Sequence, residues 1–93
     1  MKRKLLKSTS FIRASKKLIK KSPVVAEDLF LCLRQLEEDA FHPSLKTHKL
    51  KGVLDGSLAA SVGYNLRIIF SLVDYQGFES ILLQTIGTHD EVY

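Results

Sequence analysis

Two histidines, an arginine and a tyrosine are the residues of this 93-residue chain with the most suggestive chemistry. The stretches that contain them are KTHKLKG around His48, LRIIFSLV around Arg67, and GTHDEVY, which holds His89 and Tyr93. The sequence has no Cys or His pairs at zinc-ligand spacing, no glycine-rich phosphate loop and no carboxylate cluster suited to magnesium. If the chain is an enzyme, we expect it to work without a metal or another cofactor.

These residue types suit the cleavage of RNA by its own 2′-hydroxyl group. That reaction needs a base for the 2′-OH proton, an acid for the leaving 5′-oxygen, and fixed positive charge near the phosphate. Histidine, with an ordinary pKa of about 6.5, can be base or acid at neutral pH. Arginine places a permanent charge on phosphate oxygens, and tyrosine can stack on a base or donate a proton.

Basic residues are unevenly distributed along the chain, whose net charge is +4. Lys46, Lys49 and Lys51 flank His48 and could hold an RNA backbone. Nine of the fourteen Lys and Arg residues precede the first acidic residue, Glu27: Lys2, Arg3, Lys4, Lys7, Arg13, Lys16, Lys17, Lys20 and Lys21. Such a one-signed segment attracts polyanions or acidic protein segments, so Arg13 and Lys17 are further RNA-binding candidates. A solvated helix face is the alternative interpretation.

Length and composition predict a single domain over residues 1–93. The chain is 45% hydrophobic and 26% charged, as in ordinary globular proteins. No stretch approaches the roughly 20 apolar residues of a membrane span. The single cysteine, Cys32, cannot form an internal disulfide. We therefore expect a cytoplasmic protein without membrane contact.

Two helices are predicted in the first 40 residues, after a short segment at 3–8 that is either an edge strand or a frayed start. From Ser10, the spacing of Phe11, Ala14 and Leu18 is helical, with lysines and arginine on the opposite face. Ser22 followed by Pro23 predicts the start of a second helix. Its apolar stripe consists of Val25, Leu29, Cys32, Leu33 and Leu36. The short connection predicts an antiparallel helix hairpin.

The second half of the chain is predicted to form strands. Residues 41–57 contain Pro43, Gly52 and Gly56 and are predicted as loop with at most a short strand. Three apolar runs follow, and a turn at 74–77 makes the last two an antiparallel pair. The predicted fold is α+β: a short N-terminal strand and an antiparallel helix hairpin packed on a C-terminal antiparallel β-meander. We expect the hairpin to cover one sheet face and the other to stay partly open around Arg67.

Two features near the predicted site have other interpretations. THDE fits a helix capping box, with Thr88 as N-cap and Glu91 three residues later, but only one helical turn could follow. Arg67 could pair with Asp55, Asp74 or Asp90 instead of binding phosphate.

The segments HKLKGVLDGSLAASVGYNLRIIFSLV and ILLQTIGTHDEVY resemble the RelE/ParE toxin superfamily, and most of all its YafQ-like branch. The resemblance covers essentially the whole chain and is most specific from His48 onward. It implies a RelE-like fold and the toxin role of a type II toxin–antitoxin system. It also implies metal-independent cleavage of mRNA, on the ribosome, and a cognate antitoxin as partner in a hetero-oligomer.

The resemblance also implies roles for individual residues. His89 and His48 match the histidines of YafQ-like toxins, Tyr93 the terminal aromatic residue, and Arg67 the arginine directed at the scissile phosphate. Two positions depart from the pattern: Ser61 stands where a histidine is expected. Asn65 stands where an aspartate is expected, and an amide cannot accept a proton at pH 7. Asn65 is either natural, which leaves His48 and His89 to carry the chemistry, or an inactivating substitution.

Two other functions compatible with this resemblance are kept as alternatives. A ParE-like toxin would share the fold but inhibit gyrase by binding it, and the pair of histidines with Arg67 argues against that. A catalytically weakened member would mainly bind its antitoxin, and Ser61 and Asn65 favour that interpretation.

Overall fold

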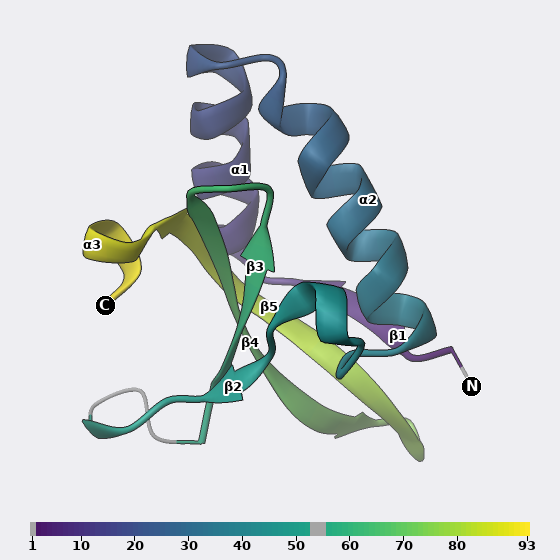
Figure 1. Ribbon diagram of the computed structural model, residues 1–93. Coiled ribbons are helices and arrows are strands. Elements are labelled where there is room, and N and C mark those ends of the chain that lie inside the picture. Colours follow the sequence, from purple (N-terminus) through teal and green to yellow (C-terminus); the bar gives the residue numbers. More distant parts are fainter. Residues whose placement is uncertain (1, 53–55) are drawn as a thin grey trace.

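The computed structural model describes residues 2–52 and 56–93. Along the chain it contains β1 (Lys4–Lys7), α1 (Thr9–Lys21), α2 (Val25–Glu38), the 3-10 turn η1 (Pro43–Leu45), β2 (His48–Lys49), β3 (Leu58–Val62), β4 (Leu66–Tyr75), β5 (Phe78–Thr88) and α3 (His89–Val92). The strands form one sheet in the order β1-β5-β4-β3-β2. The predicted α+β fold is confirmed, with α1 and α2 running in opposite directions in Figure 1.

The two long helices are separated by a tight connection whose details differ from the prediction. Ser8 begins α1, and its hydroxyl accepts a hydrogen bond from the Phe11 N–H at 3.0 Å. The sequence predicted that Ser22 is the N-cap of the second helix, and this prediction is wrong. The Ser22 N–H donates to the Leu18 carbonyl at 2.8 Å and so ends α1. The second helix begins only at Val25, because residues 23–24 form the turn that reverses the chain.

The C-terminal meander is antiparallel, as predicted, and two further strands extend it. β3 pairs with β4, and β4 with β5, both antiparallel. The predicted turn at 74–77 joins β4 to β5, and its Gly77 has a positive φ of 84°. β1 adds to the free edge of β5 in parallel orientation, and the short β2 adds antiparallel to β3. The N-terminal segment is therefore an edge strand of the sheet rather than a frayed start.

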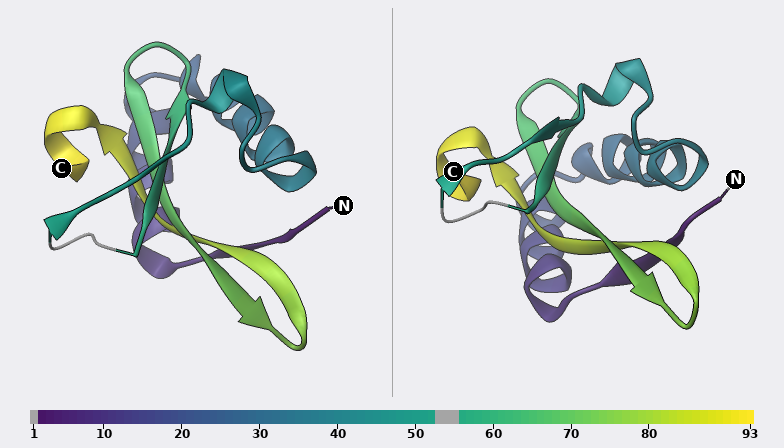
Figure 2. Two further views of the ribbon diagram at one scale, coloured as in Figure 1. Left: turned by 60° about the horizontal axis from the view of Figure 1, so that its bottom comes forward. Right: turned by 90° about the horizontal axis from the view of Figure 1, so that it is seen from below.

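One face of the sheet carries the main core beneath both helices. Leu66, Ile68, Phe70 and Leu72 of β4 lie in this core, as their alternation predicted. Phe11 from α1 and Leu29, Cys32 and Leu36 from α2 are buried in the same cluster. Ile69 of β4 pairs with Thr85 of β5 and Phe70 pairs with Leu83, so Gln84 is an extra, bulged residue of β5. The two views in Figure 2 show both helices and the twisted β4–β5 hairpin.

The other face of the sheet has a much smaller apolar cluster. It consists of Leu50, Ala59 and Ile69, against which Val92 of α3 packs. No long helix covers this face in the described part of the chain, so it stays partly open, as predicted. We call it the open face. His48, Arg67 and His89 lie here because β2, β4 and α3 all contribute to this face.

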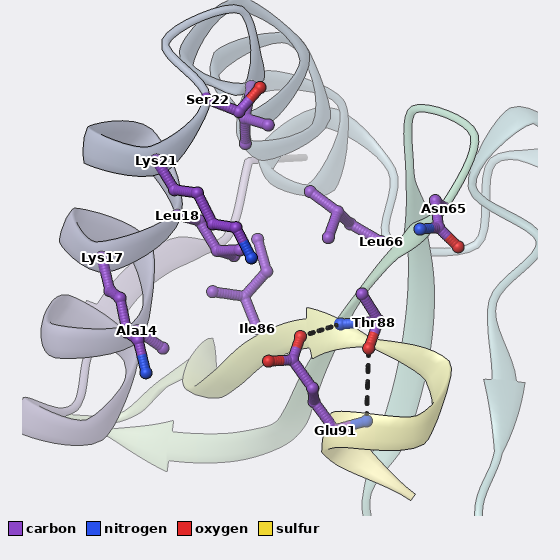
Figure 3. A pocket seen from close by; sticks show the side chains of 11 residues that line it. Ala14, Lys17, Leu18, Lys21, Ser22, Asn65, Leu66, Ile86, Thr88 and Glu91 are labelled. Atoms are coloured by element: carbon purple, nitrogen blue, oxygen red, sulfur yellow. Dashed lines mark hydrogen bonds between the residues drawn. The ribbon is translucent and has the colours of Figure 1, made fainter.

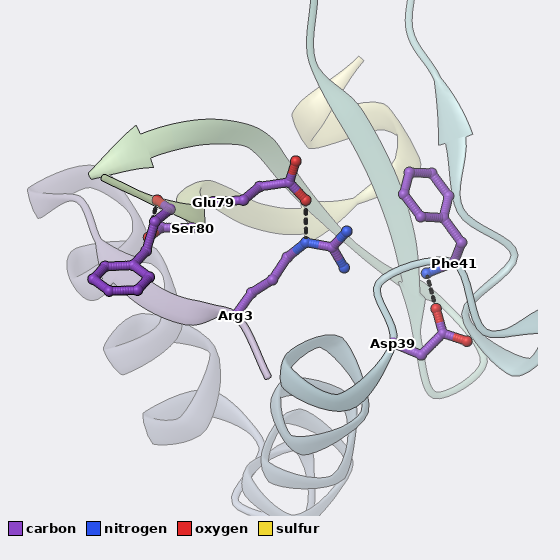
Figure 4. Close-up of polar contacts among 6 residues, drawn as sticks. Arg3, Asp39, Phe41, Glu79 and Ser80 are labelled. Atoms are coloured by element: carbon purple, nitrogen blue, oxygen red, sulfur yellow. Dashed lines mark hydrogen bonds and ion pairs between the residues drawn. The ribbon is translucent and has the colours of Figure 1, made fainter. Parts of the chain in front are cut away.

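Side-chain contacts fix the N-terminal strand and the end of α2 (Figure 4). The Arg3 guanidinium forms an ion pair and a hydrogen bond with the Glu79 carboxylate of β5. The backbone N–H of Arg3 donates to the Glu37 carbonyl at 3.0 Å. The Asp39 carboxylate accepts from the Phe41 N–H at 3.0 Å just after α2 ends. None of the helices in residues 2–52 and 56–93 is both long and apolar enough to cross a membrane.

Candidate active site

β2 and the turn before it place His48 at the edge of the open face. Lys46 ends η1 in the left-handed conformation, with φ of 51°, and so redirects the chain into β2. His48 pairs with Ala59 of β3, and its side chain is exposed. Its Nδ1 lies 3.1 Å from the Lys46 carbonyl. A carbonyl can only accept, so this contact places the proton of a neutral ring on Nδ1 and leaves Nε2 as an acceptor.

The single turn α3 carries His89 and Tyr93 at the other end of the site. The capping box read in THDE is present: the Thr88 hydroxyl accepts from the Glu91 N–H at 3.3 Å. In return, the Glu91 carboxylate accepts from the Thr88 N–H at 2.8 Å. One helical turn does follow the cap, with the Tyr93 N–H donating to the His89 carbonyl at 3.0 Å. The predicted capping box is therefore confirmed, and the helix that it caps is a single turn.

Tyr93 lies between the two histidines and joins them into one cluster. Its hydroxyl oxygen is 3.4 Å from His48 Nε2, across 45 positions of sequence. Its ring meets the His89 ring edge to face, with centroids 4.3 Å apart and an angle of 81° between the planes. Since His48 Nε2 is free to accept, the tyrosine hydroxyl can donate to it. The three side chains are exposed, so a large substrate can reach them.

Arg67 lies on the same open face, in the middle of the sheet. It is half-buried and pairs with Ser61 on β3 and Gly87 on β5. Its guanidinium Nη1 donates to the Leu66 carbonyl at 2.9 Å. Among the described residues no ion pair involves Arg67; of its suggested partners, Asp55 lies outside them. At the usual strand spacing of about 4.8 Å, β2 and β4 are separated by about 10 Å, which leaves room for a nucleotide.

The proposed RNA-binding residues fall into two groups. Lys46, Lys49 and Lys51 are exposed and flank His48 along the chain. Arg13 and Lys17 are exposed on α1, which packs on the helix-covered side of the sheet. The structure therefore places the first group beside the histidine cluster and the second group on a different element.

A groove of about 490 Å³ separates α1 from α3 (Figure 3). Its apolar lining includes Ala14, Leu18, Val25, Leu66 and Ile86. Lys17 and Lys21 project from α1 on one side, and Glu91 lies on the other, where its two hydrogen bonds to Thr88 are drawn. The groove thus connects the basic helix with the turn that carries His89 and Tyr93.

Asn65 and Ser61, the two departures from the expected pattern, lie apart from the histidine cluster. Asn65 is exposed beside the β3–β4 turn and lines one end of the groove. No hydrogen bond within the described residues joins it to His48, His89 or Tyr93. Ser61 lies opposite Arg67, and its carbonyl accepts a weak hydrogen bond from the Cys32 thiol at 3.6 Å. Burial raises the pKa of that thiol to about 12, in keeping with a core residue.

Gly87 shapes the site, although it is not among the site residues predicted from the sequence. A Cβ atom built on it would lie 3.1 Å from the Glu91 Cβ and 3.1 Å from the Val92 Cγ1. A larger residue here would therefore require the Glu91 and Val92 side chains to move by a few tenths of an ångström, whereas glycine lets α3 fold back closely over the end of β5. The signal in the sequence was a glycine at the end of an otherwise apolar strand, directly before a cap.

The docking of α3 should depend on pH through Glu91. The hydrogen bond from the Thr88 N–H lowers the pKa of this carboxyl below its ordinary value, and the Thr88 side chain and the charges of Lys21 and Lys17 act in the same direction. A lowered folded-state pKa means that the stabilising effect is present at neutral pH and is lost as the pH falls through that pKa. We expect the NMR signals of the Thr88 amide proton and of the Tyr93 ring protons to shift as Glu91 is protonated, at a pH below the ordinary range for a glutamate. A Thr88 amide shift that stays constant down to pH 2 would contradict the capping contact.

Comparison with known proteins gives a clear structural result. No protein-family model matches the chain, and no curated protein matches its sequence. YafQ from E. coli strain BL21(DE3) superposes with a TM-score of 0.78 at 20% identity, over 98% of each chain. A chain of the E. coli DinJ–YafQ toxin–antitoxin complex gives 0.76 at 21% identity, over 100% of this chain and 99% of that one. A chain of the YoeB–YefM complex from Staphylococcus aureus gives 0.72 at 16% identity, over 96% and 99%.

These superpositions cover both helices and the whole sheet, because they extend over nearly the full length of each chain. The short N-terminal strand, the helix hairpin and the meander thus recur in the same order and arrangement in proteins of low sequence identity. The chain therefore has the fold found in YafQ and in the matched chain of the YoeB–YefM complex.

Proposed function

We propose that this chain is the toxin of a type II toxin–antitoxin system and that it cleaves mRNA by attack of the 2′-hydroxyl group. The observation that carries the proposal is the His48–Tyr93–His89 cluster on the open face. Surface histidines far apart in sequence have no structural need to meet at a tyrosine, whereas acid–base catalysis needs such a meeting. The shared fold with YafQ adds support from an independent side.

The proposed reaction uses two proton transfers and no redox change. A base removes the 2′-OH proton, the 2′-oxygen bonds to phosphorus, and the bond from phosphorus to the 5′-oxygen breaks as an acid protonates that oxygen. The products are a 2′,3′-cyclic phosphate and a 5′-hydroxyl end. We assign His89 and His48 to acid and base, with His89 the leading candidate. Tyr93 stacks on a base or donates a proton.

Positive charge completes the proposed site. Arg67 is assigned to the phosphate, where it would offset the charge that builds up in the transition state. The exposed lysines around His48, with Lys49 and Lys51 foremost, would hold the RNA backbone, and Arg13 and Lys17 would extend that contact to ribosomal RNA. An exposed, shallow site of this kind suits a substrate presented by another particle, which is why we place the reaction on the ribosome.

An antitoxin is the proposed protein partner. Chains of this fold occur in the DinJ–YafQ toxin–antitoxin complex and in the YoeB–YefM complex. By analogy we expect a hetero-oligomer in which the antitoxin blocks the open face.

Induction of the chain in a bacterial host, with mapping of mRNA 5′ ends, tests the function. We expect cuts in phase with codons, and their absence when His89 is replaced by alanine. His42→Asn is a matched control, because His42 only caps η1 through its Nδ1 contact with the Ser44 N–H. Growth arrest without cuts would favour gyrase binding, and the absence of both would favour a weakened antitoxin-binding member. Either result overturns the proposal.

Asn65→Asp should raise the rate of mRNA cleavage. Asn65 lines the end of the groove that Thr88, the residue before His89, also lines, so a carboxylate there would add a proton acceptor at that end of the groove. The measurement is single-turnover cleavage by the purified parent and variant. A variant no faster than the parent would mean that position 65 is not a missing catalytic group.

A further inference from the structure

The helical turn that carries two of the site residues is too short to be stable without support. α3 spans only His89–Val92, and forming a first helical turn in isolation is unfavourable. The positions of His89 and Tyr93 therefore depend on whatever fixes this turn to the rest of the protein.

Glu91 makes the contacts that fix the turn at its start. Its carboxylate accepts from the Thr88 N–H at 2.8 Å, and its own N–H donates to the Thr88 hydroxyl at 3.3 Å. Across the groove, Lys17 and Lys21 provide positive charge toward the same carboxylate. Glu91 itself touches neither His48 nor Tyr93 in any described contact, so it has no direct part in the proposed chemistry.

Two close packing contacts complete the attachment of the turn. Val92 packs on the small apolar cluster of the open face, and Gly87 allows the turn to approach β5. Val92 supplies apolar contact without fixing a direction for the neighbouring side chains. The directed contacts, and hence the orientation of the turn, come from the capping box.

We infer that Glu91 is a positioning residue, which holds α3 through Thr88 so that Tyr93 stays between His48 and His89. The inference rests on the proposed nuclease function. Without the capping box, the turn keeps its apolar contact but loses its fixed orientation, and the tyrosine hydroxyl leaves the neighbourhood of His48 Nε2. The effect should appear in kcat, because the RNA-binding lysines around His48 are on a different element.

Four variants separate this role from general effects of charge and stability. Glu91→Ala removes the carboxylate, and Thr88→Val removes the hydroxyl that accepts from the Glu91 N–H. Glu91→Gln keeps an oxygen that can accept from the Thr88 N–H but removes the charge. Glu38→Ala is the charge-matched control, because Glu38 is an exposed acid whose ion pair is with Lys2, on a different part of the protein.

The measurements are kcat and KM for cleavage and the NMR contacts between the rings of Tyr93, His48 and His89. For Glu91→Ala and Thr88→Val we expect kcat to fall about tenfold or more with little change in KM, since a misplacement of about 1 Å can cost up to about 100-fold. Both variants should lose the contact between Tyr93 and His48. Glu91→Gln and Glu38→Ala should keep the parent kcat and the contact.

The outcomes distinguish this inference from the function on which it rests. Parent-like kcat and intact ring contacts in Glu91→Ala would overturn the positioning role. An equal loss in Glu91→Gln and Glu91→Ala would also overturn it, by assigning the effect to charge alone. If the parent does not cleave RNA, the proposed function fails, and the ring contacts then decide by themselves whether Glu91 holds Tyr93 in place.

Discussion

Replacement of either His48 or His89 with alanine should lower the rate of RNA cleavage by about 10²–10⁴-fold. The attacking hydroxyl and the leaving oxygen each need a proton transfer in the transition state, and alanine can perform neither. Cleavage by the purified chain, measured under single-turnover conditions across a range of pH, checks this. The parent should give a bell-shaped profile, and each variant should lose one limb of it. The missing limb would show which histidine is base and which is acid.

The double variant provides a sharper version of the same test. Residues that act as one catalytic unit are strongly non-additive, so His48→Ala combined with His89→Ala should cost little more than the worse single variant. Independent surface residues would instead give the product of the two losses. Folding should be unaffected, because both side chains are exposed. His42→Asn, at a histidine that caps η1, should cleave at the parent rate. Parent-like activity in both alanine variants would contradict the assignment.

The elements that position this site were mostly predictable from local patterns. Alternating Leu66, Ile68 and Phe70 identified the helix-covered face of β4, and the 3.6-residue spacing of Leu29, Cys32 and Leu36 identified the buried side of α2. Such signals are local and repeat within one element. They therefore survive tertiary packing well.

Long-range pairing was the part of the fold that local patterns could not supply. The parallel alignment of Leu5 with Ile81 joins the first strand to the last, and nothing near either residue encodes it. The function of Ser22 also depended on context. A serine before a proline can end one helix or begin the next. The hydrogen bond from the Ser22 N–H to the Leu18 carbonyl shows that Ser22 ends α1.

The candidate site was predictable in residue type but not in geometry. The chemistry of His48, His89 and Tyr93 could be read from the sequence. Their meeting could not, because it depends on the register of β2 and on α3 folding back over Gly87. Asn65 is an example of the opposite case. Its position in the sequence predicted a place among the catalytic residues, but in the structure it lines the end of the groove.

Phe70→Ala should cost about 3–5 kcal/mol of the free energy of unfolding. Phe70 has no exposed surface and lies in the main core, where it pairs with Leu58 on β3 and Leu83 on β5. Alanine leaves a cavity among residues from both helices and three strands. Small domains have only about 5–15 kcal/mol of stability, so a loss of this size brings a domain at the lower end of that range close to its unfolding midpoint. Urea denaturation with a fixed m-value measures the loss.

Phe78→Ala is the matched control for this loss of stability, because the same side chain is removed from a position that is 74% exposed. Its free energy of unfolding should stay within about 0.5 kcal/mol of the parent value. The Phe70 variant also separates stability from chemistry. Its cleavage rate should fall in proportion to the folded fraction and recover when the temperature is lowered, whereas the histidine variants stay inactive although they are folded. An equal loss of unfolding free energy for both variants would contradict the burial of Phe70 and the exposure of Phe78. A folded Phe70→Ala chain without activity would contradict the separation of the main core from the proposed site.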